Sequence, residues 1–248
     1  MADPVSDTNL QYLKSLYPYH EPASSSDVIE NPWYLVVIVT LTAGNRPEAV
    51  PLVYKYVLDE LERAQGKFNV PEGKVYSEKL LLSRKFRDAI FKCGMIAGYS
   101  KAINALASLL DATLEELRDT TRQRETALSL PELEKRGQKF FRDLYGETAD
   151  DVQKLLDRIY PDMGWFSNTI AYGSVYGYTD ILNQLETSYV LVGALIAADT
   201  PRQINWHLNN ARRAHASFEQ TSAVRQIAIK VSQSVGVSWR DGVPEVKE

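Results

Sequence analysis

An internal repeat is the feature of this sequence that most constrains how the chain can fold. Two segments share a proline followed by an arginine, a lysine and a glycine: Pro47, Arg87, Lys92 and Gly98 in the first, and Pro201, Arg225, Lys230 and Gly236 in the second. In both segments the lysine follows the arginine by five residues, and the glycine follows the lysine by six. The first segment is longer between its proline and its arginine by 40 − 24 = 16 residues. A tandem duplication of one helical unit accounts for this pattern.

The two copies differ at a position where a histidine is available for chemistry. When they are aligned on their prolines, His207 of the second copy lies opposite Val53 of the first. The candidate site is therefore placed in the second copy. Of the other histidines, His215 is expected to be exposed because it lies about 80° away from His207 around the helix, and His20 is expected in a solvated loop.

The hydrophobic pattern predicts an all-α protein. Apolar residues recur near helical spacing along 77–110, and no convincing run alternates between apolar and polar residues as a half-buried strand would. The runs 35–43 and 189–198 are apolar but too short to cross a bilayer, and we interpret them as buried helices. Glycines and tyrosines in 172–178, YGSVYGY, predict a turn. Lys92 lies off the apolar face of its helix and is expected at a helix end or on the surface.

A rise in charge density marks the candidate boundary between the two halves. The segment 111–136 is expected to form an exposed helix with a connector that ends at Pro131. This divides the chain into 1–130, an N-terminal repeat with an extension before it, and 131–248, a C-terminal repeat that carries His207.

Composition and charge exclude some classes of partner. Lys+Arg 28 and Asp+Glu 32 give a net charge of −4 without a basic block or stripe, so we expect neither nucleic-acid nor membrane binding. The acidic, polar N-terminal sequence is unlike a signal or transit peptide, and the C-terminal sequence is unlike a Ser-Lys-Leu tail. The single cysteine favours a reducing compartment. We expect a cytoplasmic protein, with an organellar matrix as the open alternative.

Several segments resemble the carboxymuconolactone decarboxylase family. They are FRDAIFKCGMIAGYSKAINAL, which is similar to the acidic helix, aromatic/Gly turn and Asn-Ala-Leu helix of that family, and NRPEAVPLV and DTPRQINWHLNNA, which are similar to its histidine-bearing helix. The resemblance covers about 33–110 and about 180–237. It implies an all-helical AhpD-like fold in tandem form. That fold hosts lactone decarboxylases, thiol-based hydroperoxide reductases and members with no assigned reaction, so the fold alone does not fix the activity.

The thiol chemistry of the family does not fit this sequence. The peroxidase branch carries Cys-x-x-Cys before the histidine, and here Thr200 and Gln203 stand at the two thiol positions relative to His207. Cys93 has no second thiol to resolve a disulfide, and we expect it to be a small core residue. Thiol peroxidase activity is therefore unlikely to be the function, and we expect no cofactor and no metal ion.

The decarboxylase chemistry of the family fits in part. Loss of CO2 from a lactone leaves an enolate-like charge that must be stabilised and protonated. The resemblance makes His207 the proton donor, Glu186 a relay, and Arg212 or Arg225 an anchor for a substrate carboxylate. Gln203 and Asn210 lie on the same helix face as His207 and complete the candidate binding set. The function expected is cofactor-free acid–base lyase or isomerase chemistry on a small carboxylated ring or enol-lactone.

A second interpretation stays open beside the enzyme. Val53 replaces the histidine of the first copy, and Lys92 stands where the decarboxylases often place another histidine. His207 is equally compatible with a buried structural role, Glu186 with stabilisation of a helix N-terminus, and Arg225 with tying its helix to a neighbour. The alternative function is a non-catalytic or small-molecule-binding member of the fold. Since helices of different subunits build the site in single-copy relatives, we also expect a homo-oligomer.

Overall fold

The computed structural model describes residues 5–18 and 21–247, and within these ranges every regular element is a helix. The prediction of an all-α protein is confirmed, and His20 lies outside the described residues. The elements before the connector are α1 (Asp7–Leu16), α2 (Ser26–Glu30), α3 (Trp33–Ala43), η1 (Pro47–Ala49), α4 (Val50–Lys67), α5 (Glu72–Ala97) and α6 (Tyr99–Ala112). Those that follow are η2 (Glu115–Leu117), α7 (Leu130–Tyr145), η3 (Gly146–Thr148), α8 (Ala149–Ile159), α9 (Pro161–Phe166), η4 (Ser167–Tyr176), α10 (Gln184–Ala197), α11 (Pro201–Arg213) and α12 (Phe218–Ser234).

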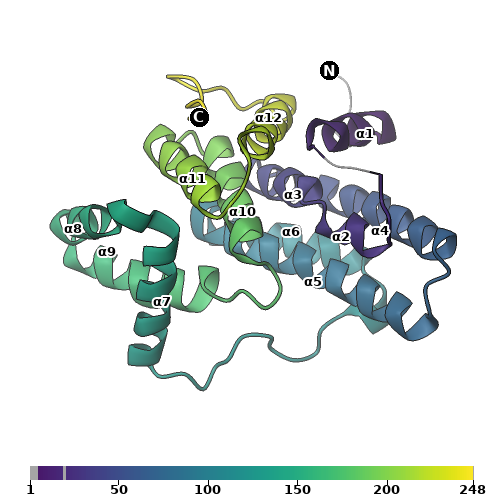
Figure 1. Ribbon diagram of the computed structural model, residues 1–248, viewed down its shortest axis with the longest axis horizontal. Coiled ribbons are helices and arrows are strands. Elements are labelled where there is room, and N and C mark those ends of the chain that lie inside the picture. The colour runs from purple at the N-terminus through teal and green to yellow at the C-terminus, as the bar shows by residue number, and fades with distance from the viewer. Residues whose placement is uncertain (1–4, 19–20, 248) are drawn as a thin grey trace.

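Two helices that lack a polar face form the centre of the molecule. All residues of α3 are buried, and α10 is buried continuously from Glu186 to Ile196. The two helices pack on each other, and each of them also packs on both α5 and α12 (Figure 1). Helices that are apolar on every side need partners on every side, and this arrangement supplies them. The two apolar runs are buried helices, as expected.

The turns that precede the two repeat prolines have the same backbone geometry. Asn45 and Asp199 both adopt the left-handed conformation, with φ of 56° and 51°. The next residue has φ of −117° in both turns. Further along, Gly98 and Gly236 follow the ends of α5 and α12 with φ of 106° and 87°. These matched conformations support a duplicated unit.

The hydrophobic cores do not divide at residue 130. The main core joins buried residues of 5–109 with those of 182–231, so both predicted halves contribute to it. A smaller core draws on α7, α8, η4 and α10. The boundary between 1–130 and 131–248 therefore remains a prediction about ancestry, whereas packing mixes the two halves.

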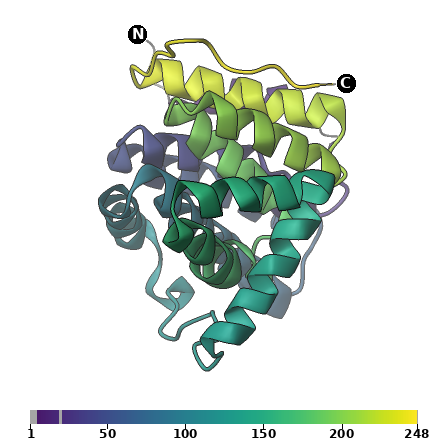
Figure 2. The same cartoon turned by 90° about the vertical axis from the view of Figure 1, so that its left-hand side faces the viewer.

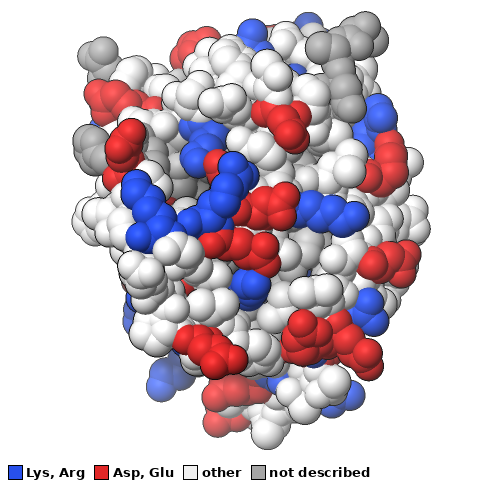
Figure 3. Space-filling view, turned by 90° about the vertical axis from the view of Figure 1, so that its right-hand side faces the viewer, with Lys and Arg blue, Asp and Glu red and all other residues white. Residues whose placement is uncertain are grey.

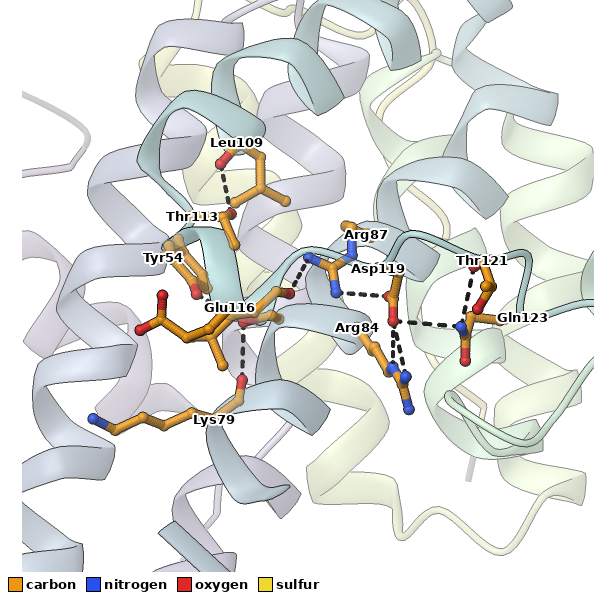
Figure 4. A network of polar contacts seen from close by, with 12 residues as sticks. Tyr54, Lys79, Arg84, Arg87, Leu109, Thr113, Glu116, Asp119, Thr121 and Gln123 are labelled. Atoms are coloured by element: carbon orange, nitrogen blue, oxygen red, sulfur yellow. Dashed lines mark hydrogen bonds and ion pairs between the residues drawn. The ribbon is translucent and has the colours of Figure 1, made fainter. Parts of the chain in front are cut away.

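The charged segment after α6 is a connector in which the structure describes only the short 3-10 helix η2, and the exposed α-helix expected there does not form before α7 begins. Arg84 and Arg87 of α5 both pair with the Asp119 carboxylate at 2.8 Å (Figure 4). Arg87 also donates to the Leu117 carbonyl at 3.0 Å. The carbonyl at the end of a short helix needs a donor from elsewhere, and Arg87 of α5 provides one for Leu117.

The segment 130–176 forms a second layer beside the main core, below α11 and α12 in Figure 2. Glycines allow α7 and η4 to approach closely within it. A Cβ atom on Gly137 would lie 1.7 Å from the Asn168 carbonyl oxygen, and one on Gly173 would lie 2.3 Å from the Leu133 carbonyl oxygen. No side chain fits in either place.

Replacing Gly137 with Ala is expected to push α7 and η4 apart and to lower the free energy of unfolding by about 1–3 kcal/mol. Gly66→Ala is the matched control, because an added Cβ there meets no atom within 4 Å on α4. That control is expected to raise the free energy of unfolding by about 0.4–1 kcal/mol. Urea unfolding of both variants measures the difference, and equal effects would contradict the close contact.

Candidate functional site

His207 lies on α11 and lines a cavity of about 240 Å³. The walls come from the C-terminal end of α5 and from α7, α8, α9, η4, α10 and α11. Aromatic side chains make up much of the lining: Phe141, Tyr145, Phe166, Tyr172, Tyr176 and Trp206. The cavity therefore lies between the second layer and the main core, and both layers are needed to form it.

The π-helix η4 supplies one wall of this cavity. The turn expected at 172–178 is instead the last part of this π-helix, which ends at Tyr176 and is followed by Gly177. Tyr172 and Tyr176 are buried and both line the cavity. The π-helix is rare and occurs frequently at functional sites, so its position here marks the cavity as a candidate site.

A chain of hydrogen bonds connects His207 to two tyrosines. The Tyr145 hydroxyl lies 3.3 Å from His207 Nε2 and 3.1 Å from the Tyr172 hydroxyl. Asn210, one turn after His207, is fully buried, and its side-chain oxygen accepts from Arg213 at 3.2 Å. Within the described residues, His207 Nδ1 and the Asn210 amide nitrogen have no hydrogen-bond partner. Buried polar atoms without partners are rare in proteins, and the His207 nitrogen belongs to a residue of the cavity lining.

Burial determines the protonation states of His207 and of the tyrosines bonded to it. It lowers the pKa of His207 from 6.5 to about 4, because a charged imidazolium would be desolvated. It raises the pKa of Tyr145 to about 12 for the corresponding reason. At neutral pH the hydrogen-bonded row of His207, Tyr145 and Tyr172 therefore consists of a neutral imidazole and neutral phenols. Such a chain binds a polar group by hydrogen bonding, and it is able to pass a proton between its members.

Gln203 lies at the mouth of the cavity, one turn before His207. It is an exposed lining residue, as are Met95, Met163 and Phe166. Of the six candidate residues, the structure thus brings two to the cavity, His207 and Gln203, while Asn210 is buried one turn further along α11 and does not line it. All three residues lie on α11, and their assignment as one binding set stays a prediction.

Glu186 does not contact His207 in the structure. Its carboxylate forms an ion pair with Lys85 of α5, and both side chains are buried. The same carboxylate accepts from the Asn183 N–H at 3.1 Å, while the Asn183 side chain accepts from the Glu186 N–H at 2.9 Å. This reciprocal pair is a capping box at the start of α10, and it is the helix-stabilising role considered as the alternative for Glu186.

Arg212 and Arg225 are also engaged away from the cavity. Arg212 donates to the Ala216 carbonyl just after the end of α11. Arg225 donates to the carbonyls of Val243 and Pro244 at 2.7 and 2.6 Å and pairs with Glu245 at 2.7 Å. Arg87, which the sequence pattern aligns with Arg225, holds the connector through the same combination of a carbonyl and a carboxylate. The repeated arginine therefore fixes the segment that follows each half.

Sequence reasoning missed the tyrosines and Trp206. Tyr145 ends the aromatic run FFRDLY, and Tyr172 and Tyr176 lie in the tyrosine-rich segment that was interpreted as a turn. Aromatic clustering in two separate segments was the available signal. Neither segment revealed that it would face His207.

Lys92 is fully buried, which corrects the expectation of a surface or helix-end residue. Its ammonium donates to the Tyr178 carbonyl at 2.9 Å and the Thr187 hydroxyl at 2.8 Å, and it lies 3.2 Å from the Asp88 carboxylate. Burial lowers the pKa of Lys92 to about 8, although Asp88 opposes this shift. Lys92 does not line the cavity, and it connects α5 to α10 and to the loop before it.

Cys93 is buried, as expected for a core residue. Its thiol donates to the Val39 carbonyl at 3.4 Å, and burial raises its pKa to about 12. The thiolate is the reactive form of cysteine, and this environment suppresses it.

A larger hollow of about 1020 Å³ lies between α1 and α4 and has a different character. Charged side chains of both signs line it. Charges of both signs are also interspersed over the face of the molecule shown in Figure 3. Within the described ranges, no group of three or more His, Cys, Asp or Glu is placed to hold a metal ion. None of the helices described is both long and apolar enough to cross a bilayer.

Comparison with known proteins gives two relatives over nearly the whole chain. The chain is 26% identical over 281 residues to Peroxisomal protein 2 of Saccharomyces cerevisiae, covering 95% of this chain and 97% of the relative. It is 24% identical over 210 residues to Peroxisomal protein 2 of Schizosaccharomyces pombe, covering 85% of this chain and 90% of the relative. No protein-family model matches the chain.

Proposed function

We propose that this protein binds a small molecule in the aromatic cavity beside His207, as a tandem member of the carboxymuconolactone decarboxylase-like, AhpD-like fold. The observation that carries the proposal is the buried, neutral His207 in the wall of a cavity of about 240 Å³, with Nδ1 lacking a partner among the described residues. Small-molecule sites are concave, mostly apolar and equipped with a few polar groups. The cavity matches this description, whereas the arginines expected to hold a substrate carboxylate and the glutamate expected to relay a proton are engaged elsewhere.

The test is ligand capture from a cell extract, with bound molecules identified by mass spectrometry. Ala171 is buried in the cavity lining, and Ala171→Leu is expected to fill the space and abolish capture. Ala112→Leu, a partly buried site at the end of α6 outside the cavity lining, is the matched control. Capture that survives in Ala171→Leu, or the absence of any captured molecule, would contradict the proposal.

A second candidate function is acid–base catalysis at the same cavity, by a lyase or isomerase without a cofactor. The hydrogen-bonded chain from His207 through Tyr145 to Tyr172 favours it, because that chain provides a path for a proton. If the captured molecule is converted to a product, His207→Gln is expected to reduce turnover by about 100-fold or more. Turnover that is unchanged in His207→Gln would exclude His207 as the proton donor.

We also propose an organellar rather than a cytoplasmic location. The support is the name shared by the two relatives, which describes them as peroxisomal. Cell fractionation with a peroxisomal marker tests the location. Recovery of the protein in the cytosolic fraction alone would contradict this assignment.

Homo-oligomer formation remains part of the proposal. Large apolar side chains are exposed near α9, in a segment that also borders the cavity mouth: Ile159, Tyr160, Met163, Trp165 and Phe166. Clusters of this kind are typical of protein contacts. Light scattering coupled to size-exclusion chromatography measures the mass, and a mass of 28.0 kDa would exclude a stable oligomer.

A further inference from the structure

We infer that the cavity takes an uncharged molecule built around a single ring, bearing a hydroxyl or carbonyl group, and that it discriminates against carboxylates. This inference rests on the proposed function, since it names the chemical class of the ligand for the same cavity. It departs from the carboxylated ring that the sequence resemblance implies.

In the part of the chain that the structure describes, the lining of the cavity offers no positive charge to a ligand. None of the described lining residues has a charged side chain. Three basic residues of neighbouring elements are already paired: Arg213 binds Glu147 and the Asn210 side chain, Arg124 binds Asp88, and Lys85 binds Glu186. A carboxylate that enters the cavity loses its hydration and gains no counter-charge, which costs far more than burying a neutral group of the same size.

The volume and the aromatic walls of the cavity suit a ligand with a single ring. A dry cavity of about 150 Å³ is large enough for benzene, so about 240 Å³ accommodates one substituted ring. The walls are aromatic and meet edge to face, with the Tyr145 ring centroid 6.2 Å from that of Tyr172 and 6.3 Å from that of Trp206. An aromatic or other flat ring makes favourable contacts with both the faces and the edges of such walls.

The lining of the cavity also contains polar groups that are available for hydrogen bonds to a ligand. Within the described residues, His207 Nδ1 is a buried atom without a hydrogen-bond partner, and the hydroxyls of Tyr176 and Ser167 take part in none of the hydrogen bonds described; all three residues line the cavity. Burial raises the pKa of Tyr176, so its hydroxyl stays protonated and is available both to donate and to accept. A ligand with one hydroxyl or carbonyl group satisfies such a position, whereas a plain hydrocarbon leaves it unpaired.

The mouth of the cavity agrees with an apolar ligand. Its exposed lining residues include two methionines, Met95 and Met163, beside Phe166. Thioether side chains are flexible and adapt to apolar groups that pass or bind.

The experiment compares p-cresol, a neutral ring with a hydroxyl, with benzoate, an anionic ring of similar size. Isothermal titration calorimetry at pH 7 is expected to give a dissociation constant for p-cresol at least about tenfold lower than for benzoate. Tyr176→Phe is expected to weaken p-cresol binding by about three- to tenfold. Tyr12→Phe, at an exposed position on α1, is the control and should leave p-cresol affinity unchanged.

A charge introduced at the mouth tests the argument from the opposite direction. Gln203→Arg places a guanidinium at the exposed end of the lining, and it is expected to raise the affinity for benzoate by about tenfold or more. If the native protein binds benzoate as tightly as p-cresol, and Ala171→Leu blocks the binding of both, the inference is overturned. The proposed function then stays intact. If neither p-cresol nor benzoate binds, the inference fails. If, in addition, the native protein captures no molecule from a cell extract, the proposed function fails too.

Discussion

Replacing Asp88 with Ala is expected to lower the free energy of unfolding by about 3–5 kcal/mol. Asp88 is a buried residue of α5, and its carboxylate pairs with Arg124 at 2.6 Å and with the fully buried Lys92 at 3.2 Å. Without this carboxylate, the Lys92 ammonium stays in the interior with no opposite charge in contact. Urea unfolding at pH 7 measures the loss.

Two further variants separate this effect from the general cost of a substitution. Asp151→Ala removes an exposed carboxylate that lies 3.5 Å from Lys154, and it is expected to change the stability by less than about 0.5 kcal/mol. Adding Lys92→Met to an Asp88→Leu variant is expected to recover part of the loss, because no buried ammonium then remains. If Asp88→Ala lowers the free energy of unfolding by less than about 1 kcal/mol, the ion pair of Asp88 with Lys92 does not stabilise the contact that Lys92 makes between α5 and α10.

The second large effect is a loss of stability in acid that depends on His207. Burial lowers the pKa of His207 to about 4 in the folded protein, against 6.5 for the ordinary side chain. Between these values the unfolded chain binds a proton that the folded chain does not, so stability falls as pH falls from 6.5 towards 4. The full difference is about 3 kcal/mol, of which about 2 kcal/mol is expected between pH 7 and pH 5.

His207→Gln should remove this part of the pH dependence, because glutamine does not titrate. The measurement is urea unfolding at pH 7, 6 and 5 for the native protein and the variant. His215→Asn serves as the control, since His215 is exposed just after the end of α11. If the native protein and His207→Gln lose stability in parallel over this range, His207 is not buried as a neutral ring.

The parts of the fold that sequence predicted are those that local pattern determines. The apolar run of α3 is long enough for a helix and has no polar face, so its complete burial follows from the residues themselves. Pro47 and Pro201 mark the first turns of helical segments because proline loses little there. These signals lie within a few residues of the structure that they predict.

The features that were missed depend on residues far apart in the sequence. Lys92 is buried because Tyr178 and Thr187, more than 80 residues away, supply oxygen atoms to its ammonium. The π-helix η4 packs against α7 through Gly137 and Gly173, and such a contact has no local signature. Tertiary partners therefore decided the outcome in both places.

The candidate site divides in the same way. His207, Gln203 and Asn210 were placed together because one helix carries all three, and helical periodicity is a reliable guide. Glu186 was expected beside His207 because it lies on the preceding helix, but Lys85 of α5 takes its carboxylate. Sequence reasoning had no means of knowing that this competitor exists.

The complete burial of α3 has a consequence for synthesis of the chain. Its central partner α10 begins about 140 residues after α3 ends, which corresponds to roughly 7–28 seconds at the usual rate of translation. During that interval α3 leaves the ribosome with a fully apolar surface and no partner for the side that α10 will cover. Newly made chains should therefore need a chaperone until the C-terminal helices emerge, and chains truncated before α10 should aggregate.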